Sequence, residues 1–144
     1  MAAGMNAPLY TTEILRLAAS LDEPRRLERE DGRAEARSPT CGSTVKVAIQ
    51  LDRRKRILGL SQRVHACAFG QASATLMERG AIGRGRDEIA EAVTSLTVWL
   101  AGEREDPGHW PGIGALTPAI PRKSRHGAII LPFRALLAAI ESAE

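Results

Sequence analysis

The sequence predicts an α+β fold, in which a small antiparallel sheet of about three strands carries helices packed on one face. Two observations lead to this prediction. Two stretches that alternate apolar and polar residues are separated by a short basic turn, and apolar residues at helical spacing precede and follow them. With 144 residues, of which 44% are hydrophobic and 26% charged, the chain fits one globular domain spanning residues 1–144.

The clearest strand is predicted at residues 44–52, where side chains alternate between two faces. Its apolar face is formed by Val45, Val47, Ile49 and Leu51. Residues 53–56, Arg-Arg-Lys-Arg, form a basic tip, and residues 57–65 form a second strand with Leu58, Leu60 and Val64 on one face. Together the two strands predict an antiparallel hairpin.

A first helix is predicted at residues 12–21, because apolar residues recur there at helical spacing and Thr11 or Thr12 can cap its start. Residues 22–37 mix both charges with a proline and a glycine, which is typical of an exposed connector. A short strand near residues 34–38 ends this connector.

Two helices are predicted directly after the hairpin. A helix begins after Cys67, and Gly80 stands where a C-cap glycine would end it. A second helix starts near Asp87, whose charge suits the positive N-terminal end of a helix, and Gly102 closes it. Trp99 is predicted to lie in the core.

The C-terminal part is predicted to contain a long loop and one helix. Residues 103–121 are rich in Gly and Pro, with one short turn at residues 113–116. The last helix covers residues 132–143, with Pro132 in the first turn, where proline is well tolerated.

Composition argues against several classes of function. The net charge is only +3, and the five aromatic residues are too few for a stacking surface, which argues against nucleic-acid binding. The longest apolar run, at residues 128–133, is much shorter than a membrane span, and residues 1–21 lack the pattern of a signal peptide. A soluble cytoplasmic protein is therefore expected, whose two cysteines are thiols or metal ligands.

The two cysteines flank the predicted hairpin. Cys41 comes directly before the first strand, and Cys67 lies between the end of the second strand and a helix. Because antiparallel pairing places these strand ends side by side, the two thiols can meet at one end of the sheet. The unpaired N–H groups at the start of the helix favour a thiolate at Cys67. Burial as two small apolar side chains is the alternative interpretation, but this arrangement favours a metal or sulfur site.

The motifs around both cysteines resemble those of NifU/IscU-type iron–sulfur cluster scaffolds. Pro39-Thr40-Cys41-Gly42 before a strand is similar to the family's first cysteine motif. Ala66-Cys67, followed by Gln-Ala-Ser-Ala at residues 71–74, is similar to the second. The opening helix and residues 32–39 also resemble the family, and the loop at residues 103–125 is similar to the longer, SufU-like branch. The resemblance spans residues 9–140.

This resemblance implies a NifU/IscU-like fold and a scaffold domain of the family's N-terminal type, which is not an enzyme. Such a scaffold assembles a [2Fe–2S] cluster and exchanges it with partners, namely cysteine desulfurase and apo iron–sulfur proteins. At the family's ligand positions this chain has Cys41, Cys67 and His126. Two positions differ, because Ser43 stands where the family has aspartate and Gly127 stands where it has the third cysteine.

These two differences leave several alternatives open. A [2Fe–2S] cluster takes four protein ligands, so water, a small thiol, His65 or another subunit of a homo-oligomer would have to complete the set. Iron alone, or zinc held by two thiolates and one imidazole, is also compatible with the residues. A family member that lost cluster chemistry and serves as an interaction or regulatory module is the other alternative. The basic tip at residues 53–56 is predicted to be a solvated turn, with a docking patch for an acidic partner as the second interpretation.

Overall fold

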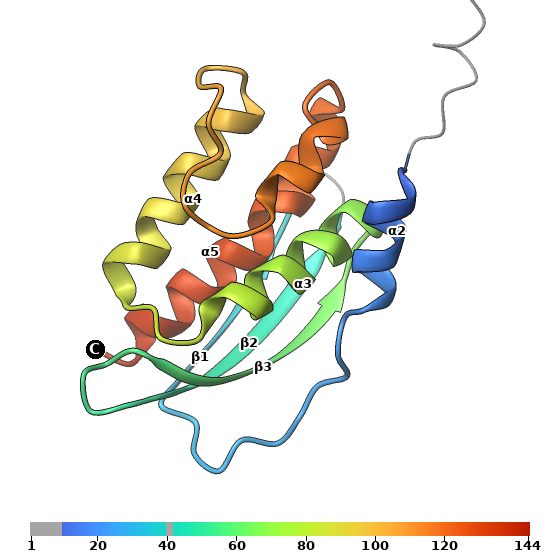
Figure 1. The fold of residues 1–144 in the computed structure, drawn as a ribbon. Helices are drawn as coiled ribbons and strands as arrows, with labels where there is room; N and C mark the ends of the chain where they lie inside the picture. Colours follow the sequence, from blue (N-terminus) through green and yellow to red (C-terminus); the bar gives the residue numbers. More distant parts are fainter. Residues whose placement is uncertain (1–9, 40–41) are drawn as a thin grey trace, which may run out of the picture.

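The computed structural model describes residues 10–39 and 42–144. Along the chain, its elements are α2 (Thr12–Ala19), β1 (Gly32–Arg37), β2 (Thr44–Leu51), β3 (Ile57–His65), α3 (Ala68–Ala81), α4 (Arg86–Leu100), the 3₁₀ helices η1 (Ile113–Ala119) and η2 (Lys123–Arg125), and α5 (His126–Ser142). Figure 1 shows these elements in chain order. No helix in the described part of the chain is long and apolar enough to cross a membrane.

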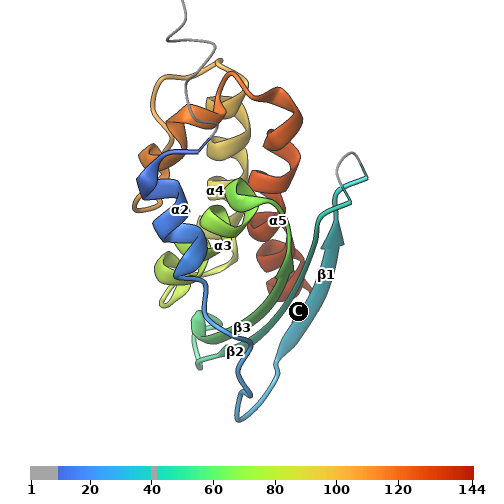
Figure 2. The same cartoon turned by 90° about the vertical axis from the view of Figure 1, so that its right-hand side faces the viewer.

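The three strands form one antiparallel sheet in the order β1-β2-β3. All the helices lie on one side of this curved sheet, as the side view in Figure 2 shows. The α+β prediction is therefore confirmed. The pairing of β2 with β3 begins at Thr44 opposite His65, so the residues that precede β2 and follow β3 lie at the same end of the sheet.

The core lies between the inner face of the sheet and the helices α3 and α5. Alternate residues of β2 point into it, as the period-two pattern predicts: Val45, Val47, Ile49 and Leu51 are buried. Phe69 of α3 and Phe133 of α5 are fully buried in the same hydrophobic core. Trp99 is buried too, which confirms its predicted place in the core.

Leu58 does not share the buried face of β3. Its side chain is 53% exposed, whereas Ile57 and Leu60 are buried. The register shifts between Gln50 and Leu51, which pair with Gly59 and Ile57 respectively, so Leu58 is the additional residue of a β-bulge. The sequence-based prediction for Leu58 is wrong because a bulge interrupts the alternation on which that prediction depends.

Gly80 does not cap α3, because the helix continues to Ala81. The left-handed backbone conformation falls instead on Gly83, whose φ is +86°. Gly80 is needed for a different reason: a Cβ on it would lie 2.5 Å from Nε1 of Trp110, which donates a hydrogen bond to the carbonyl of Leu76. The glycine therefore makes room for a tryptophan 30 positions further along the chain.

Pro132 lies inside α5 rather than in its first turn, since the helix begins at His126. Proline lacks an N–H, so the backbone bond from position 132 to the carbonyl of Ala128 is missing. One turn of the helix is held from outside, because the Ser73 hydroxyl of α3 donates to the Ile129 carbonyl at 2.5 Å. Packing against α3 thus supports a helical turn that the local sequence disfavours.

The connector before β1 is fastened to the sheet by Asp31. Arg29 Nε donates to one of its carboxylate oxygens at 2.7 Å, and the Leu51 N–H donates to the other at 2.7 Å. The hydrogen bond from Arg29, followed by that from Leu51, lowers the pKa of Asp31 below its ordinary value. The folded protein therefore stabilises the ionised carboxylate.

Acidification is expected to destabilise the protein partly through Asp31. Because its pKa is lower folded than unfolded, the unfolded chain binds the proton first, and the stabilisation is lost as the pH falls through the folded pKa. We predict that Asp31→Asn is less stable than wild type near neutral pH and that this difference shrinks in acid. Urea unfolding across this pH range checks it, with Asp87→Asn, at a side chain that is 95% exposed, as control. An unchanged difference at every pH would contradict this account.

Candidate functional site

The loop between β1 and β2 forms one wall of the candidate site. Its base is closed by backbone hydrogen bonds from Ser38 N to the Ser43 carbonyl at 2.9 Å and from Gly42 N to the Ser38 carbonyl at 3.0 Å. Gly42 has a φ of +73°, a conformation that glycine adopts without strain. Cys41, a predicted ligand, lies outside the described residues, so the structure places only the base of the loop that carries it.

Cys67 is the N-cap residue of α3, at the end of the sheet where this loop lies. Thr44 pairs with His65, so Ser43, which precedes β2, and Cys67, which follows β3, lie at the same end of the sheet. The Cys67 thiol is free and half-buried, and its side chain makes no capping hydrogen bond. The first N–H groups of a helix have no partner within the helix, so they can donate to a negatively charged group bound at this position.

His126 is the first residue of α5 and is fixed by its own backbone surroundings. Its Nε2 lies 2.9 Å from the Ala119 carbonyl and 3.0 Å from the Ile120 carbonyl. Both neighbours are acceptors, so Nε2 carries the proton and donates, and a neutral ring then has its lone pair on Nδ1. Metal-bound histidines commonly use this arrangement, in which one ring nitrogen binds metal and the other donates to a carbonyl.

Close approaches at two glycines bring these segments together. A Cβ built on Gly127 would lie 3.0 Å from the Ser38 Oγ, at the base of the loop that carries Cys41. A Cβ built on Gly70 would lie 2.6 Å from the Ala66 Cβ and 3.2 Å from the Ala128 carbonyl oxygen. The start of α5 therefore lies between the β1–β2 loop and the start of α3, which are the segments that carry the predicted ligands.

The described residues do not by themselves complete a metal centre. Within residues 10–39 and 42–144, no group of three or more His, Cys, Asp or Glu side chains could hold a metal ion. Cys67 and His126 stay predicted ligands on adjoining segments, and Cys41 lies outside the described residues. His65, one of the alternatives for a further ligand, is exposed at the end of β3.

Ser38 is a site residue that sequence reasoning missed. Although it adjoins the loop, it is only 5% exposed, and its side chain faces Gly127. Ser43, which stands where the family has aspartate, is equally buried at 5%. Both serines support the base of the loop from within. In the sequence, Ser38 is marked only by its place directly before Pro39, the first residue of the cysteine motif. That place does not indicate which way its side chain points.

A separate polar cluster ties the first connector to α3. The Gln62 amide donates to the Ala74 carbonyl at 3.0 Å and to Glu78 at 3.1 Å, and Arg25 forms an ion pair with Glu78 at 3.1 Å. Burial is the main reason that the pKa of Glu78 is raised above its ordinary value. None of the predicted ligands takes part, so this cluster is distinct from the candidate site.

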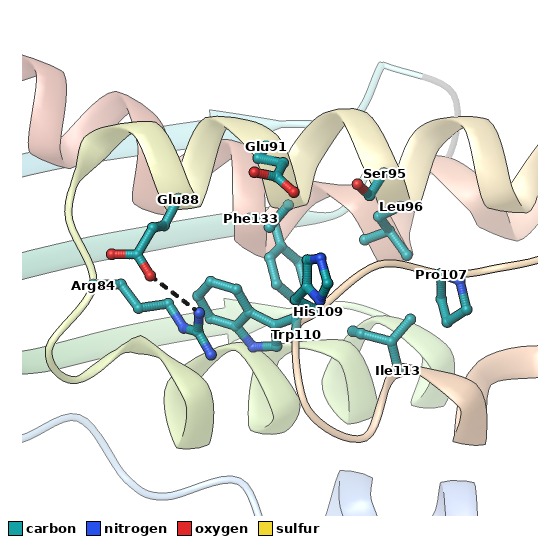
Figure 3. Close-up of a pocket in the computed structure, with 11 residues that line it drawn as sticks. Arg84, Glu88, Glu91, Ser95, Leu96, Pro107, His109, Trp110, Ile113 and Phe133 are labelled. Atoms are coloured by element: carbon teal, nitrogen blue, oxygen red, sulfur yellow. Dashed lines mark hydrogen bonds and ion pairs between the residues drawn. The ribbon is translucent and has the colours of Figure 1, made fainter.

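A cavity of about 200 Å³ opens between α4 and the loop that follows it. Figure 3 shows its aromatic floor of Trp110 and Phe133, which meet edge to face at a centroid distance of 5.1 Å. The Arg84 guanidinium lies 4.5 Å from the centre of the Trp110 ring and forms an ion pair with Glu88. Neither Cys67 nor His126 lines this cavity, so it is not the site that the motifs predict.

Comparison with known proteins gives matches at the level of structure. No protein-family model and no curated protein sequence matches the chain. A crystal structure of a nitrogen-fixing NifU-like protein (N-terminal) from Brucella abortus has a TM-score of 0.85 and 29% identity, with 94% of each chain covered.

Two further solved structures share the fold. A protein from Fervidobacterium islandicum AW-1, assigned as an iron–sulfur cluster assembly scaffold for the SUF system, has a TM-score of 0.79 and 22% identity over 92% of this chain and 96% of its own. A protein described only as hypothetical has a TM-score of 0.71 and 19% identity over 92% and 97%. The resemblance predicted from the cysteine motifs is thus confirmed at the level of the whole fold.

Proposed function

We propose, because this chain belongs to the NifU/IscU/SufU-like family, that it is an iron–sulfur cluster assembly scaffold. In this role it would hold a nascent [2Fe–2S] cluster as cargo and release it to apo-proteins. It would bind and transfer the cluster without acting as an enzyme. Cysteine desulfurase, as the source of sulfur, and apo iron–sulfur proteins, as recipients, are its proposed partners in the cytoplasm.

The observation that carries this proposal is the convergence of three segments at one end of the sheet. Gly127 lies against Ser38 of the β1–β2 loop, and the neighbouring Ala128 lies against Gly70 in the first turn of α3. These contacts place the start of α5 between the loop that carries Cys41 and the helix that begins after Cys67. The ligands of a cluster must converge in space, and these three segments converge at one end of the sheet.

Cys41, Cys67 and His126 are the proposed ligands. The two thiolates would bind iron through sulfur, and His126 would bind through Nδ1, since its Nε2 donates to the carbonyls of Ala119 and Ile120. A cluster takes four ligands, so this set leaves one position to water, a small thiol or a residue of a second subunit. A cluster held by an incomplete set of protein ligands would be bound less firmly, which suits a scaffold that must release it. Sulfur uptake would use Cys41 or Cys67, because the chain has no other cysteine.

Zinc is the second candidate occupant, and the number of donors favours it. Two thiolates and one imidazole, with one open position, match a common tetrahedral zinc arrangement. Metal analysis of protein purified without added metal separates the two: stoichiometric zinc that iron and sulfide do not displace would favour the zinc alternative. An interaction module that lost cluster chemistry would bind neither.

Anaerobic reconstitution tests the scaffold function. We expect wild-type protein to develop visible absorption with iron and sulfide, and Cys67→Ser to lose it by about tenfold or more, because removing one ligand weakens an already incomplete set. Far-UV circular dichroism of both proteins checks that the fold is retained. Equal absorption in wild type and in the Cys41→Ser, Cys67→Ser double variant would show that these cysteines do not hold the cluster.

A further inference from the structure

Two exposed apolar side chains lie at the end of the sheet opposite the β1–β2 loop. Leu58 is 53% exposed and Ile82 is 58% exposed. Among the described residues, only Leu15 of α2, at 49%, is another large hydrophobic residue of this kind. Single exposed apolar residues are common on protein surfaces. A pair of them beside charges without ion-pair partners is more typical of a surface that binds another molecule.

The turn after α3 brings Leu58 and Ile82 together. Residues 81–84 form a type II turn, with a hydrogen bond from Arg84 N to the Ala81 carbonyl at 3.1 Å and Gly83 at a φ of +86°. Ile57 then donates to the Arg84 carbonyl at 2.9 Å and accepts from Gly83 N at 2.8 Å, which is the pattern of an antiparallel bulge. Leu58 and Ile82 are the next residues on the two paired segments, so they lie across from one another.

The adjoining tip of the β2–β3 hairpin carries three cations without ion-pair partners. Arg53, Arg54 and Lys55 are exposed, and no carboxylate of the described residues lies within ion-pair distance of them. The nearby Asp52 accepts hydrogen bonds from the backbone N–H groups of Arg54 and Arg56 at 2.8 and 3.0 Å, which holds the turn in shape. The positive charge of the tip is therefore available to an external group.

Other cations at this end of the molecule are already paired within the chain. Arg56 lies 2.8 Å from Glu88, and Arg86 lies 2.8 Å from Glu141. The contrast shows that the available carboxylates are satisfied locally. The tip cations form no ion pair within the described residues, although Asp87, Glu88 and Glu144 line the same pocket as Arg54 and Lys55.

We propose that Arg53, Arg54, Lys55, Leu58 and Ile82, which we call the tip patch, dock an acidic segment of a partner protein that also carries apolar side chains. Carboxylates of the partner would pair with the three cations, and its apolar side chains would cover Leu58 and Ile82. Charge complementarity steers such encounters and sets their specificity.

The tip patch and the candidate cluster site are at opposite ends of the sheet. β2 has eight residues, so it separates the two ends by roughly 26 Å at about 3.3 Å per residue. Figure 2 shows the β2–β3 hairpin tip at one end of the sheet and the joined ends of β1 and β2 at the other. A partner on the tip patch would therefore leave the cluster site open, and the docking does not depend on cluster binding.

The composition of the patch disfavours two other occupants. A second copy packed patch to patch would bring like charges together, because an isologous contact uses the same surface twice. A membrane surface would require more than two apolar side chains for stable anchoring.

Titration of the isotope-labelled full chain with a synthetic peptide tests the proposal by amide chemical shifts. The peptide is rich in Glu and carries leucines on one helical face, and a scrambled peptide of the same composition is its control. We expect shifts confined to residues 53–58 and 79–84, and binding that weakens as salt is added. Leu58→Ser with Ile82→Ser, and separately Arg53→Glu with Lys55→Glu, should each weaken binding by about tenfold or more.

Matched variants keep the result specific to the tip patch. Leu15→Ser removes the comparable exposed leucine of α2, and Arg122→Glu with Lys123→Glu reverses an exposed basic pair near the other end; neither should change binding. The proposal is overturned if the peptide does not bind, or if the tip variants bind as well as wild type. Equal loss in the control variants, patch-dependent self-association, or tighter binding to anionic vesicles than to the peptide would also overturn it.

Discussion

Gly127→Cys is expected to retain a reconstituted cluster about tenfold longer than wild type, because a third thiolate would fill a position left open by the present ligand set. The new side chain needs only a small adjustment of one neighbour, the Ser38 side chain. A Cβ at residue 127 points towards Ser38 Oγ at 3.0 Å, at the base of the loop that carries Cys41. Gly127 has no left-handed backbone conformation, so a cysteine there causes no backbone strain.

The decay of visible absorption after addition of a chelator measures this retention. Gly127→Ser is the matched control, since its side chain is nearly the same size, contacts Ser38 in the same way and is a poor ligand for iron. Retention that is equal in the cysteine and serine variants would show that residue 127 does not face the cluster. A gain in the cysteine variant alone would place the start of α5 at the site.

Gly32→Ala is expected to destabilise the protein by about 3 kcal/mol, which is at the high end of the cost of overpacking. A Cβ on Gly32 would overlap the carbonyl oxygen of Ala139 in α5 and lie 3.0 Å from Ser142 Oγ. That hydroxyl is already engaged, because it accepts from Arg33 N at 3.1 Å and donates to Ala139. Backbone atoms of β1 and α5 would have to separate, and neither can move independently of the core.

Urea unfolding measures the loss for Gly32→Ala, with an unchanged dependence on denaturant indicating that only stability has changed. Gly114→Ala is the matched control, because a Cβ there has no atom within 4 Å and the backbone is not left-handed. Similar small effects at both glycines would contradict the close packing of β1 against α5.

The strands of the hairpin could be predicted from sequence because the signal and the structure share one period. The prediction for β3 agrees with Ile57–His65, and that for β2 exceeds Thr44–Leu51 by one residue. In these strands, alternation follows directly from one buried and one open face. The convergence of Cys67 with the start of β2 follows from the same antiparallel pairing.

The errors occur where distant parts of the chain decide the local structure. Gly80 looked like a helix cap, but it is needed for contact with Trp110. Pro132 looked like the start of a helix, but α5 begins six residues earlier and is supported by the bond from Ser73 to Ile129. Local propensity contains no information about either partner.

The ligand residues of the candidate site stay a prediction, and the structure adds geometry that the motifs do not contain. The motifs indicated Cys67 and His126, yet only the structure shows that His126 Nε2 lies against two backbone carbonyls, which leaves Nδ1 as the nitrogen without such a partner. The contact of Ser38 with Gly127 joins segments almost 90 positions apart, and no pattern within either segment predicts it.

Cluster transfer tests the central claim most directly. Wild-type protein is loaded anaerobically with iron and sulfide, freed of excess reagents, and mixed with an apo-ferredoxin, while visible circular dichroism follows the ferredoxin signal. The account predicts that holo-ferredoxin forms faster than with equal amounts of free iron and sulfide, and that protein carrying Cys67→Ser gives no such acceleration. A loaded wild-type protein that delivers its cluster no faster than free iron and sulfide would contradict the scaffold function.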